Sequence, residues 1–258
     1  MRHFPALGPV FLLYGLICLA SIFFLSGFHV VQPLHDMDRP DFAAIEDSAA
    51  RKLAFFDFLT PLIEDQNQRI LKVRERLLSI QAQFEQSGEF SRRDQYYIKS
   101  WVRTYRFADE ELSTEEQLTR LLRRVDIIPV AMALAQAASE SGWGSSRFAQ
   151  TANNFFGQWC YVAGCGIIPN QRSDDERHEV AKFNSVAASV RSYFYNINTH
   201  KAYQKFRQRR QQLRDAGKEL YSKDLIPTLI FYSERRQEYL DDLYQIIRVN
   251  NLSTLEQP

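Results

Sequence analysis

Hydrophobic residues between about Phe42 and Gln86 recur at the spacing of an α-helix. Steps of three, four and seven residues separate Ile63, Ile70, Val73, Leu77, Ile80 and Phe84. The pattern predicts one amphipathic helix, with Thr60 as N-cap and Pro61 in the first turn. A second helix is expected over residues 92–105. Because too few heptads are present for a coiled coil, we expect an antiparallel helical hairpin packed on the rest of the chain.

Two further helices precede a region rich in glycine and aromatic residues. Acidic residues begin and basic residues end the stretch Thr114 to Val125, which suits the dipole of a helix. Pro129 then opens an alanine-rich segment, Val130 to Ser139, which ends at Gly142. Alanine side chains let another backbone approach closely, so this segment is predicted to be a central buried helix.

The remaining chain predicts a small hairpin followed by more helix. Residues 153–168 are typical of a loop with at most a short strand, and residues 166–183 predict a hairpin with its polar turn at 170–177. Beyond Ser185 the pattern is helical to about Asn250, with breaks at Gly217 and Pro227. The expected fold class is mainly α with a small β-hairpin.

The N-terminal segment differs from everything that follows. No charged residue lies between Arg2 and Asp36, and residues 4–31 are nearly all apolar. About 20 such residues span a bilayer as a helix. Since cleavage near Ser26 is only weakly signalled, we expect an uncleaved anchor with its N-terminus in the cytoplasm, a cleaved export signal being the alternative. The predicted organisation is a membrane segment at 1–35, a helical arm at 36–110 and a main domain at 111–258.

The amino-acid composition limits the classes of molecule that this chain can bind. The 258 residues carry 32 basic and 31 acidic side chains, a net charge of +1, with 45% hydrophobic residues. This balance excludes a disordered chain, and no nucleic-acid partner is expected. The most basic stretch is Lys201, Lys205, Arg207, Arg209, Arg210, Arg214 and Lys218. Such a run is usually a solvated helix face, although it is also suited to carboxylates or lipid head groups.

Cys160 and Cys165 flank a glycine in the part of the chain that would be exported. In an oxidising compartment such a pair is expected to form a disulfide. Zinc is the weaker interpretation because neither a second cysteine pair nor a spaced histidine pair accompanies these residues. We therefore expect neither a metal nor a cofactor.

Glu140 has an unusual position at the end of the alanine-rich helix. A helix C-terminus carries partial negative charge, and small or apolar residues flank this carboxyl. Both disfavour the carboxylate and should raise its pKa, as a general acid near neutral pH requires. A capping or surface glutamate is the alternative.

The motif Glu140-Ser141-Gly142-Trp143-Gly144, followed by Asn153-Asn154-Phe155-Phe156-Gly157, resembles the signature of the bacterial glucosaminidase family, similar to glycoside hydrolase family 73. Residues 157–160, 165–166, 178–180 and 196–203 resemble the bacterial Bax subgroup of that family more closely. The likeness covers about residues 128–250. It implies a lysozyme-like helical domain that cleaves the glycan strands of peptidoglycan as a β-N-acetylglucosaminidase.

The resemblance implies that Glu140 donates a proton to the glycosidic oxygen. The second carboxylate is expected on the hairpin, where Asp174, Asp175, Glu176 and Glu179 are available. We prefer Glu179, because a strand would hold it rigidly, with Glu176 as its substitute. A solvent-facing Glu179 is the alternative, in which case the N-acetyl group of the substrate would assist Glu140.

Four further residues are candidates for substrate binding: Trp143, Asn154, Trp159 and Tyr193. Trp159 beside the cysteine loop is suited to stacking on a sugar ring, and the Tyr193 hydroxyl is expected to reach the site. Asn154 is also suited to holding its loop through backbone hydrogen bonds.

Two other functions stay open at this point. One is a wall amidase or endopeptidase, in which Cys165 would be a thiol nucleophile with His178 as its base. The other is a non-catalytic wall-binding protein that kept the groove but not the chemistry. The expected location is the inner membrane as a single-pass protein with a periplasmic catalytic domain, or the periplasm if the signal is cleaved. The expected partners are peptidoglycan glycan strands and the inner membrane.

Overall fold

The computed structural model describes residues 38–107, 111–169 and 178–256, which belong to one compact unit, 34–258. The predicted membrane segment at 1–35 lies outside the described residues. Among the helices that are described, none combines the length and apolar character needed to cross a bilayer. The predicted boundary between residues 110 and 111 falls at the edge of 108–110, which is also outside the described part.

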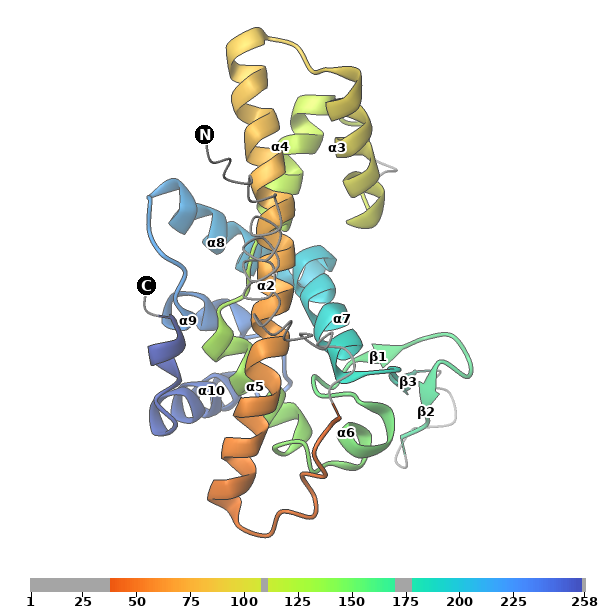
Figure 1. The fold of residues 1–258 in the computed structure, drawn as a ribbon, viewed down its shortest axis with the longest axis vertical. Coiled ribbons are helices and arrows are strands. Elements are labelled where there is room, and N and C mark those ends of the chain that lie inside the picture. Colours follow the sequence, from red (N-terminus) through yellow and green to blue (C-terminus); the bar gives the residue numbers. More distant parts are fainter. Residues whose placement is uncertain (1–37, 108–110, 170–177, 257–258) are drawn as a thin grey trace, which may run out of the picture. The chain divides into compact units, whose positions relative to one another are not determined.

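The first described helix, α2 (Ser48–Ser87), runs across α4, α5 and α7 (Figure 1). The predicted start at Thr60 is wrong, since Asp47 caps the helix by accepting from the Ala50 amide, and Pro61 lies inside it. A proline inside a helix costs about 3 kcal/mol. Burying each of Phe55, Phe58 and Leu59 recovers about 1.5–3 kcal/mol, so the helix continues through Pro61.

Helices α3 (Arg92–Thr104) and α4 (Thr114–Arg124) pack against each other. Ser91 caps α3, and Ser113 with Glu116 forms a capping box at α4. Arg76 of α2 forms an ion pair with Asp94 of α3. The predicted hairpin arm therefore contributes to the same core as the rest of the unit.

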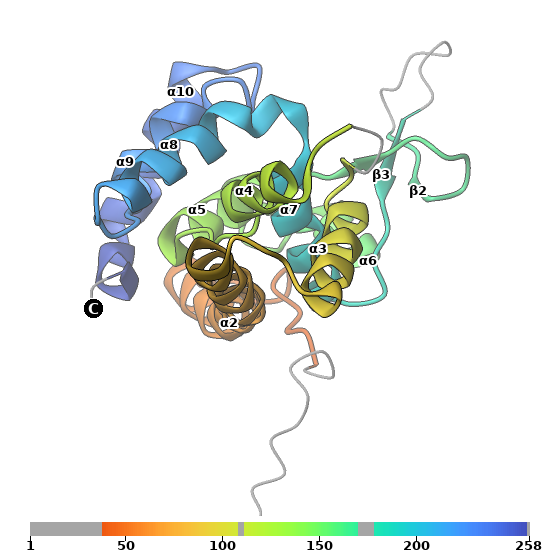
Figure 2. The same ribbon diagram turned by 90° about the horizontal axis from the view of Figure 1, so that it is seen from above.

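The alanine-rich segment forms α5 (Val130–Ser141), as predicted, and it is the central helix. Its alanines are almost completely inaccessible to solvent, and α2 and α10 pack against it. In Figure 2 α5 lies between α2 and the group α8–α10. Gly142 ends the helix in the left-handed conformation at φ +55°.

A three-stranded antiparallel sheet follows α6 (Arg147–Ala152). Its central strand is β3 (Glu179–Ala181), with β1 (Trp159–Cys160) and β2 (Gly166–Ile167) on either side. Trp159 pairs with Val180, and Gly166 pairs with Ala181. The predicted hairpin is therefore present as β2 and β3, and β1 is an additional strand. The predicted turn at 170–177 lies outside the described residues.

The C-terminal half is helical, as expected, and its helices α8–α10 lie on the other side of α5 from the strands, whereas α7 lies beside the strands (Figures 1 and 2). It comprises α7 (Val186–Thr199), η2 (Lys201–Tyr203), α8 (Gln204–Asp215), α9 (Ser222–Leu225), η3 (Ile226–Leu229), α10 (Gln237–Val249) and η4 (Leu252–Glu256). The Glu256 carboxylate accepts hydrogen bonds from the backbone amides of Ser222 and Ala131. It thereby caps the starts of both α9 and α5.

The segment before α2 is fastened to the turn that follows α5. The Arg39 guanidinium donates to the side chain and the carbonyl of Gln150, at 2.7 and 3.0 Å, and Gln150 in turn donates to the Gly144 carbonyl at 2.6 Å. The buried Phe42 ring lies so close to Gly144 that a Cβ there would approach it to 2.4 Å. Only glycine fits this turn.

The basic run is the predicted solvated face only in part, since Lys201, Lys205 and Lys218 are exposed but two of its arginines are buried. Arg207 and Arg210 are buried, and Arg210 donates five hydrogen bonds, to carbonyls around the end of α4 and to Asn198. Arg214 holds the buried Asp126 with two hydrogen bonds of 2.9 and 3.1 Å. Arg74 from α2 approaches the same carboxylate to 3.6 Å. We call Arg74, Asp126, Arg210 and Arg214 the Asp126 cluster.

Candidate active site

Glu140 is the last residue but one of α5 and is half-buried. Gly157, the last residue of the Asn-Asn-Phe-Phe-Gly segment, lies directly against its carboxyl. A Cβ on Gly157 would come within 2.9 Å of Glu140 Oε2, and the backbone there has φ +62°. The two halves of the sequence motif therefore meet in space, and the glycine leaves room for the carboxyl.

A chain of hydrogen bonds leads from the core to Glu140. The Tyr193 hydroxyl donates to Gln136 Oε1 at 2.5 Å, and Gln136 Nε2 donates to the Tyr239 hydroxyl at 3.0 Å. Tyr239 is hydrogen-bonded to Glu140. Because Tyr239 accepts from the Gln136 amide, its own proton is free to be donated to the carboxylate. All three partner side chains are buried, so this direction is fixed by the core.

The electrostatics at Glu140 favour the protonated acid. Burial raises the pKa of its carboxyl above the usual range, and the hydrogen bond from Tyr239 and the charge of Arg235 oppose this only in part. Burial, together with the nearby Glu140, raises the pKa of Tyr239 well above the usual range. The site thus combines an acid whose pKa is raised with a neutral hydroxyl that donates to it.

The partners of Glu140 were missed by the sequence analysis. Tyr203 and Tyr232 also lie in this tyrosine group, and Tyr232 stacks on Tyr239 with ring centroids 5.4 Å apart. Of these partners, Gln136 could have been predicted from the sequence, because it precedes Glu140 by four residues and so lies on the same face of the helix. Nothing local in the sequence links Tyr239, about a hundred residues away, to that face.

The predicted second carboxylate, Glu179, has different hydrogen-bond partners from Glu140. Glu179 lies on β3 as expected, but it is buried rather than solvent-facing, and its two oxygens accept from the backbone amides of Gly164 and Gly166 at 2.9 and 2.8 Å. These contacts hold the cysteine loop in place. Its substitute Glu176, like Asp174 and Asp175, lies outside the described residues.

The predicted disulfide between Cys160 and Cys165 is present. A disulfide sulfur is not a nucleophile, so the interpretation of Cys165 as a catalytic thiol is wrong for this form of the chain. The two sulfurs lie near the Glu179 carboxylate, but disulfide sulfurs are poor metal ligands, and this group does not fit a metal.

The other predicted binding residues are separated from one another. Trp159 is half exposed and stacks on His178, with ring centroids 3.7 Å apart. Trp143 instead packs edge-on against Phe55 and Phe56 of α2, and Lys52 lies over its ring. These contacts place the Trp143 indole at the α2 interface, apart from the tyrosine group around Glu140.

Asn154 and Tyr193 are both buried. Asn154 donates to the carbonyls of Gln158 and Ala181 and accepts from the Gln158 amide, so it holds its loop, as one of the two predicted interpretations states. Tyr193 stacks on Phe156, with ring centroids 4.1 Å apart, and its hydrogen bonds connect it to Glu140 through Gln136 and Tyr239.

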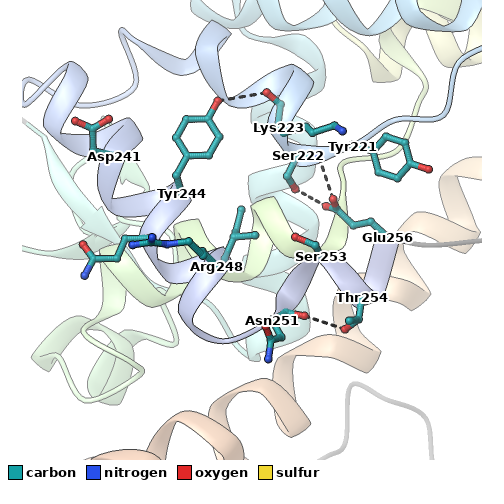
Figure 3. A pocket seen from close by; sticks show the side chains of 12 residues that line it. Tyr221, Ser222, Lys223, Asp241, Tyr244, Arg248, Asn251, Ser253, Thr254 and Glu256 are labelled. Carbon is teal, nitrogen blue, oxygen red and sulfur yellow. Dashed lines mark hydrogen bonds between the residues drawn. The ribbon is translucent and has the colours of Figure 1, made fainter.

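A cavity of about 1230 Å³ lies elsewhere, between α9, α10 and η4 (Figure 3). Tyr221, Lys223, Tyr244 and Arg248 contribute to its walls. Burial raises the pKa of its Glu256 as well. However, the oxygens of Glu256 already accept from the Ser222 hydroxyl and from backbone amides at two helix starts. This acid is therefore structural, and Glu140 is the better candidate.

The fold and the Glu140 site define a glycosidase-type domain, and comparison with known families agrees. Residues 115–252 match the glucosaminidase family, described as mannosyl-glycoprotein endo-beta-N-acetylglucosaminidase. The chain belongs to this family. It is also 34% identical over 211 residues to Protein bax of Escherichia coli (strain K12), an alignment that covers 82% of this chain and 74% of the relative. No solved structure matches the chain. The family expected from the motifs is confirmed.

Proposed function

We propose that the chain hydrolyses the glycan strand of peptidoglycan as a β-N-acetylglucosaminidase, with Glu140 as the general acid. The observation that carries the proposal is the half-buried Glu140 carboxyl, which has a raised pKa and is oriented by Tyr239. Membership of the glucosaminidase family supports a glycosidase broadly. The bond cleaved and the role of Glu140 are our inference.

Glu140 would act in its protonated form. It gives its proton to the glycosidic oxygen as the bond to the anomeric carbon breaks, which leaves a carboxylate behind. Tyr239 donates a hydrogen bond to that carboxylate, and Arg235 lies close enough to stabilise its charge. The acid is thus uncharged before the reaction and stabilised after it.

The second half of the reaction needs a nucleophile at the anomeric carbon. Glu179 stays a prediction for this role, but its oxygens already accept two backbone amides. That engagement favours the alternative in which the carbonyl oxygen of the substrate's own N-acetyl group attacks, and water then opens the intermediate. Glu140 would be the essential protein acid in that scheme.

The setting of the enzyme is part of the proposal. The uncharged segment before Asp36 supports a single-pass inner-membrane protein with a periplasmic catalytic domain, or an exported one if the segment is cleaved. The disulfide fits an oxidising compartment. A central helix ending in the acid, beside a small sheet, supports a lysozyme-like arrangement.

Digestion of purified sacculi tests the proposal. Wild-type chain should release fragments with new reducing N-acetylglucosamine ends, and Glu140→Gln should lower the rate by about 10²–10⁴-fold. Glu85→Gln, at an exposed position of α2, is the matched control and should retain the rate. Equal activity of Glu140→Gln would overturn the mechanism, and products that begin at lactoyl-amide bonds would favour the amidase. Binding to sacculi without release would favour the wall-binding protein.

A further inference from the structure

A polar cavity of about 440 Å³ lies between α2, α4 and α8, away from Glu140. The residues that line it include three arginines, one from each helix, together with neutral polar residues and one acid: Arg74, Arg123, Arg214, Gln81, Thr119, Gln211 and Asp215. Arg74 donates to the carbonyls of Leu122 and Val125, and Arg214 donates to Asp126, so Arg123 is the lining arginine that is left to bind an oxyanion.

The acids near this cavity do not balance its arginines. Asp126 takes part of the charge of Arg74 and Arg214 but shares its carboxylate with the buried Arg210, whose Nε is 4.0 Å away. Arg123 is exposed and pairs with no acid in the described ranges. Asp215, which lines the cavity, accepts a hydrogen bond of 2.6 Å from Gln211.

The pKa values of the neighbouring arginines shift in different directions, and, despite burial, that of Arg214 is raised by its hydrogen bond and charge interaction with Asp126. Burial lowers the pKa of Arg210 to about 10, and repulsion from Arg74 and Arg214 acts in the same direction, against the attraction of Asp126. Burial and the charge of Arg214 likewise lower the pKa of Arg74. Backbone carbonyls at the end of α4 offset some of this charge. An anion in the cavity would offset more.

We propose that this cavity binds a carboxylate group of a peptide stem of peptidoglycan, an inference that rests on the proposed function. The stems carry free carboxylates, and the planar fork of an arginine matches a carboxylate with two hydrogen bonds. Arg123 supplies the accessible guanidinium, and Arg214, with 27% of its side chain exposed, reaches the same opening. Gln81 and Gln211 add neutral polar groups.

The position of the cavity fits a contact with the polymer outside the cleavage site. Arg123 lies in the last turn of α4, just before α5, and Glu140 lies at the far end of α5. The 12 residues of α5 rise about 18 Å. The cavity would therefore hold a stem while the sugar backbone lies at Glu140, and it would favour glycan that carries peptides.

Isothermal calorimetry on the full-length chain tests the proposal, with an acidic tripeptide that has free carboxylates as the probe. We expect saturable binding of this peptide and none of its fully amidated form. Arg123→Ala should weaken the affinity about tenfold or more, and Arg123→Lys should restore part of it. Arg93→Ala, at an exposed position of α3, is the matched control and should bind as the wild type does.

The outcomes separate the possible ligands. Absence of peptide binding, or equal affinity of Arg123→Ala and Arg93→Ala, would overturn the proposal. Inorganic phosphate, titrated in parallel, would replace the stem carboxylate as the ligand if it bound more tightly than the peptide and was lost with Arg123→Ala. Because binding is measured without turnover, failure here is distinguishable from failure of the glycan hydrolysis experiment.

Discussion

Two acids lie near opposite ends of α5, and their surroundings give them opposite character. Glu140 faces tyrosine hydroxyls and one peripheral arginine, and burial raises the pKa of its carboxyl. Burial also acts to raise the pKa of Asp126, but Arg210, Arg214 and Arg74 outweigh it, and the pKa of Asp126 lies below its usual range. Desolvation thus acts on both acids, but the pKa is raised at one end of α5 and lowered at the other.

The difference shows what each carboxyl can do. Neutral donors orient an acid without forcing it to ionise, so Glu140 can hold a proton and release it. Guanidinium groups keep Asp126 charged and tie α2, α8 and the start of α5 together. The raised pKa of Glu256 belongs to an acid whose oxygens cap two helix starts, so Glu140 differs from Asp126 in its pKa and from Glu256 in its partners.

The largest expected effect is on the scaffold. Asp126→Asn removes the carboxylate from among three guanidiniums and should cost about 3–5 kcal/mol of the free energy of unfolding. Urea denaturation at neutral pH measures this. Since the folded pKa of Asp126 is depressed, its contribution is complete above the usual aspartate pKa and is lost only as pH falls through the folded value.

Glu140→Gln is the contrasting control for that experiment. Its raised pKa means that the charged form is unfavourable in the folded state at neutral pH, so removing the charge should not lower stability. If Asp126→Asn and Glu140→Gln lowered stability equally, the contrast between the two acids would be lost.

The second-largest expected effect is a loss of activity when the Glu140 carboxyl is displaced. Gly157→Ala would place a Cβ 2.9 Å from Glu140 Oε2. The carboxyl can move aside, so stability should fall by only about 1 kcal/mol, from the left-handed backbone. Activity on sacculi should fall much more, since a misplacement of about 1 Å can cost about 10²-fold.

Gly217→Ala separates these two causes. Gly217 has nearly the same φ, +64°, but nothing lies within 4 Å of the added Cβ. We expect the same small loss of stability and full activity. Parallel loss of activity in both variants would mean that backbone strain, and not contact with Glu140, is responsible.

The smallest effect concerns pH. Tyr239→Phe removes the hydroxyl that stabilises the Glu140 carboxylate, so the pKa of Glu140 should rise further. Because the protonated acid is the active form, the alkaline limb of the activity profile should move to higher pH. Stability should fall by about 1 kcal/mol as the Gln136 amide loses its acceptor.

Tyr96→Phe is the control for this profile, since Tyr96 is 71% exposed and lies on α3. The alkaline limb of the pH–activity profile of Tyr96→Phe should coincide with that of the wild type. If the alkaline limb of Tyr239→Phe lay at the same pH as that of the wild type, the Tyr239 hydroxyl would not act on Glu140.

Local signals allowed much of the helical framework to be predicted. The acidic start and basic end of residues 114–125 and the alanine run after Pro129 place α4 and α5 to within two residues. The start of α2 was misplaced because Thr60 and Pro61 form a strong local start signal, and only tertiary burial of Phe55 and Phe58 overrides it.

The candidate site was predictable only in part. Glu140 was identified from its place at a helix end and from the family motif. The partners that tune it were not, because the bond between Gln136 and Tyr239 joins residues 103 apart in the chain. The buried arginines of α8 were missed for a similar reason, since composition does not distinguish an arginine that binds helix-end carbonyls from one in solvent.

The contacts of Arg39 and Phe42 have a mechanical consequence. They fasten the entry of the chain into the folded unit to Gln150 and to the turn at Gly144, four residues beyond Glu140. A pull transmitted along the preceding segment would reach the unit at this clamp before it reached α2. A force applied there would therefore act on the turn that follows Glu140 more directly than on α3 and α4.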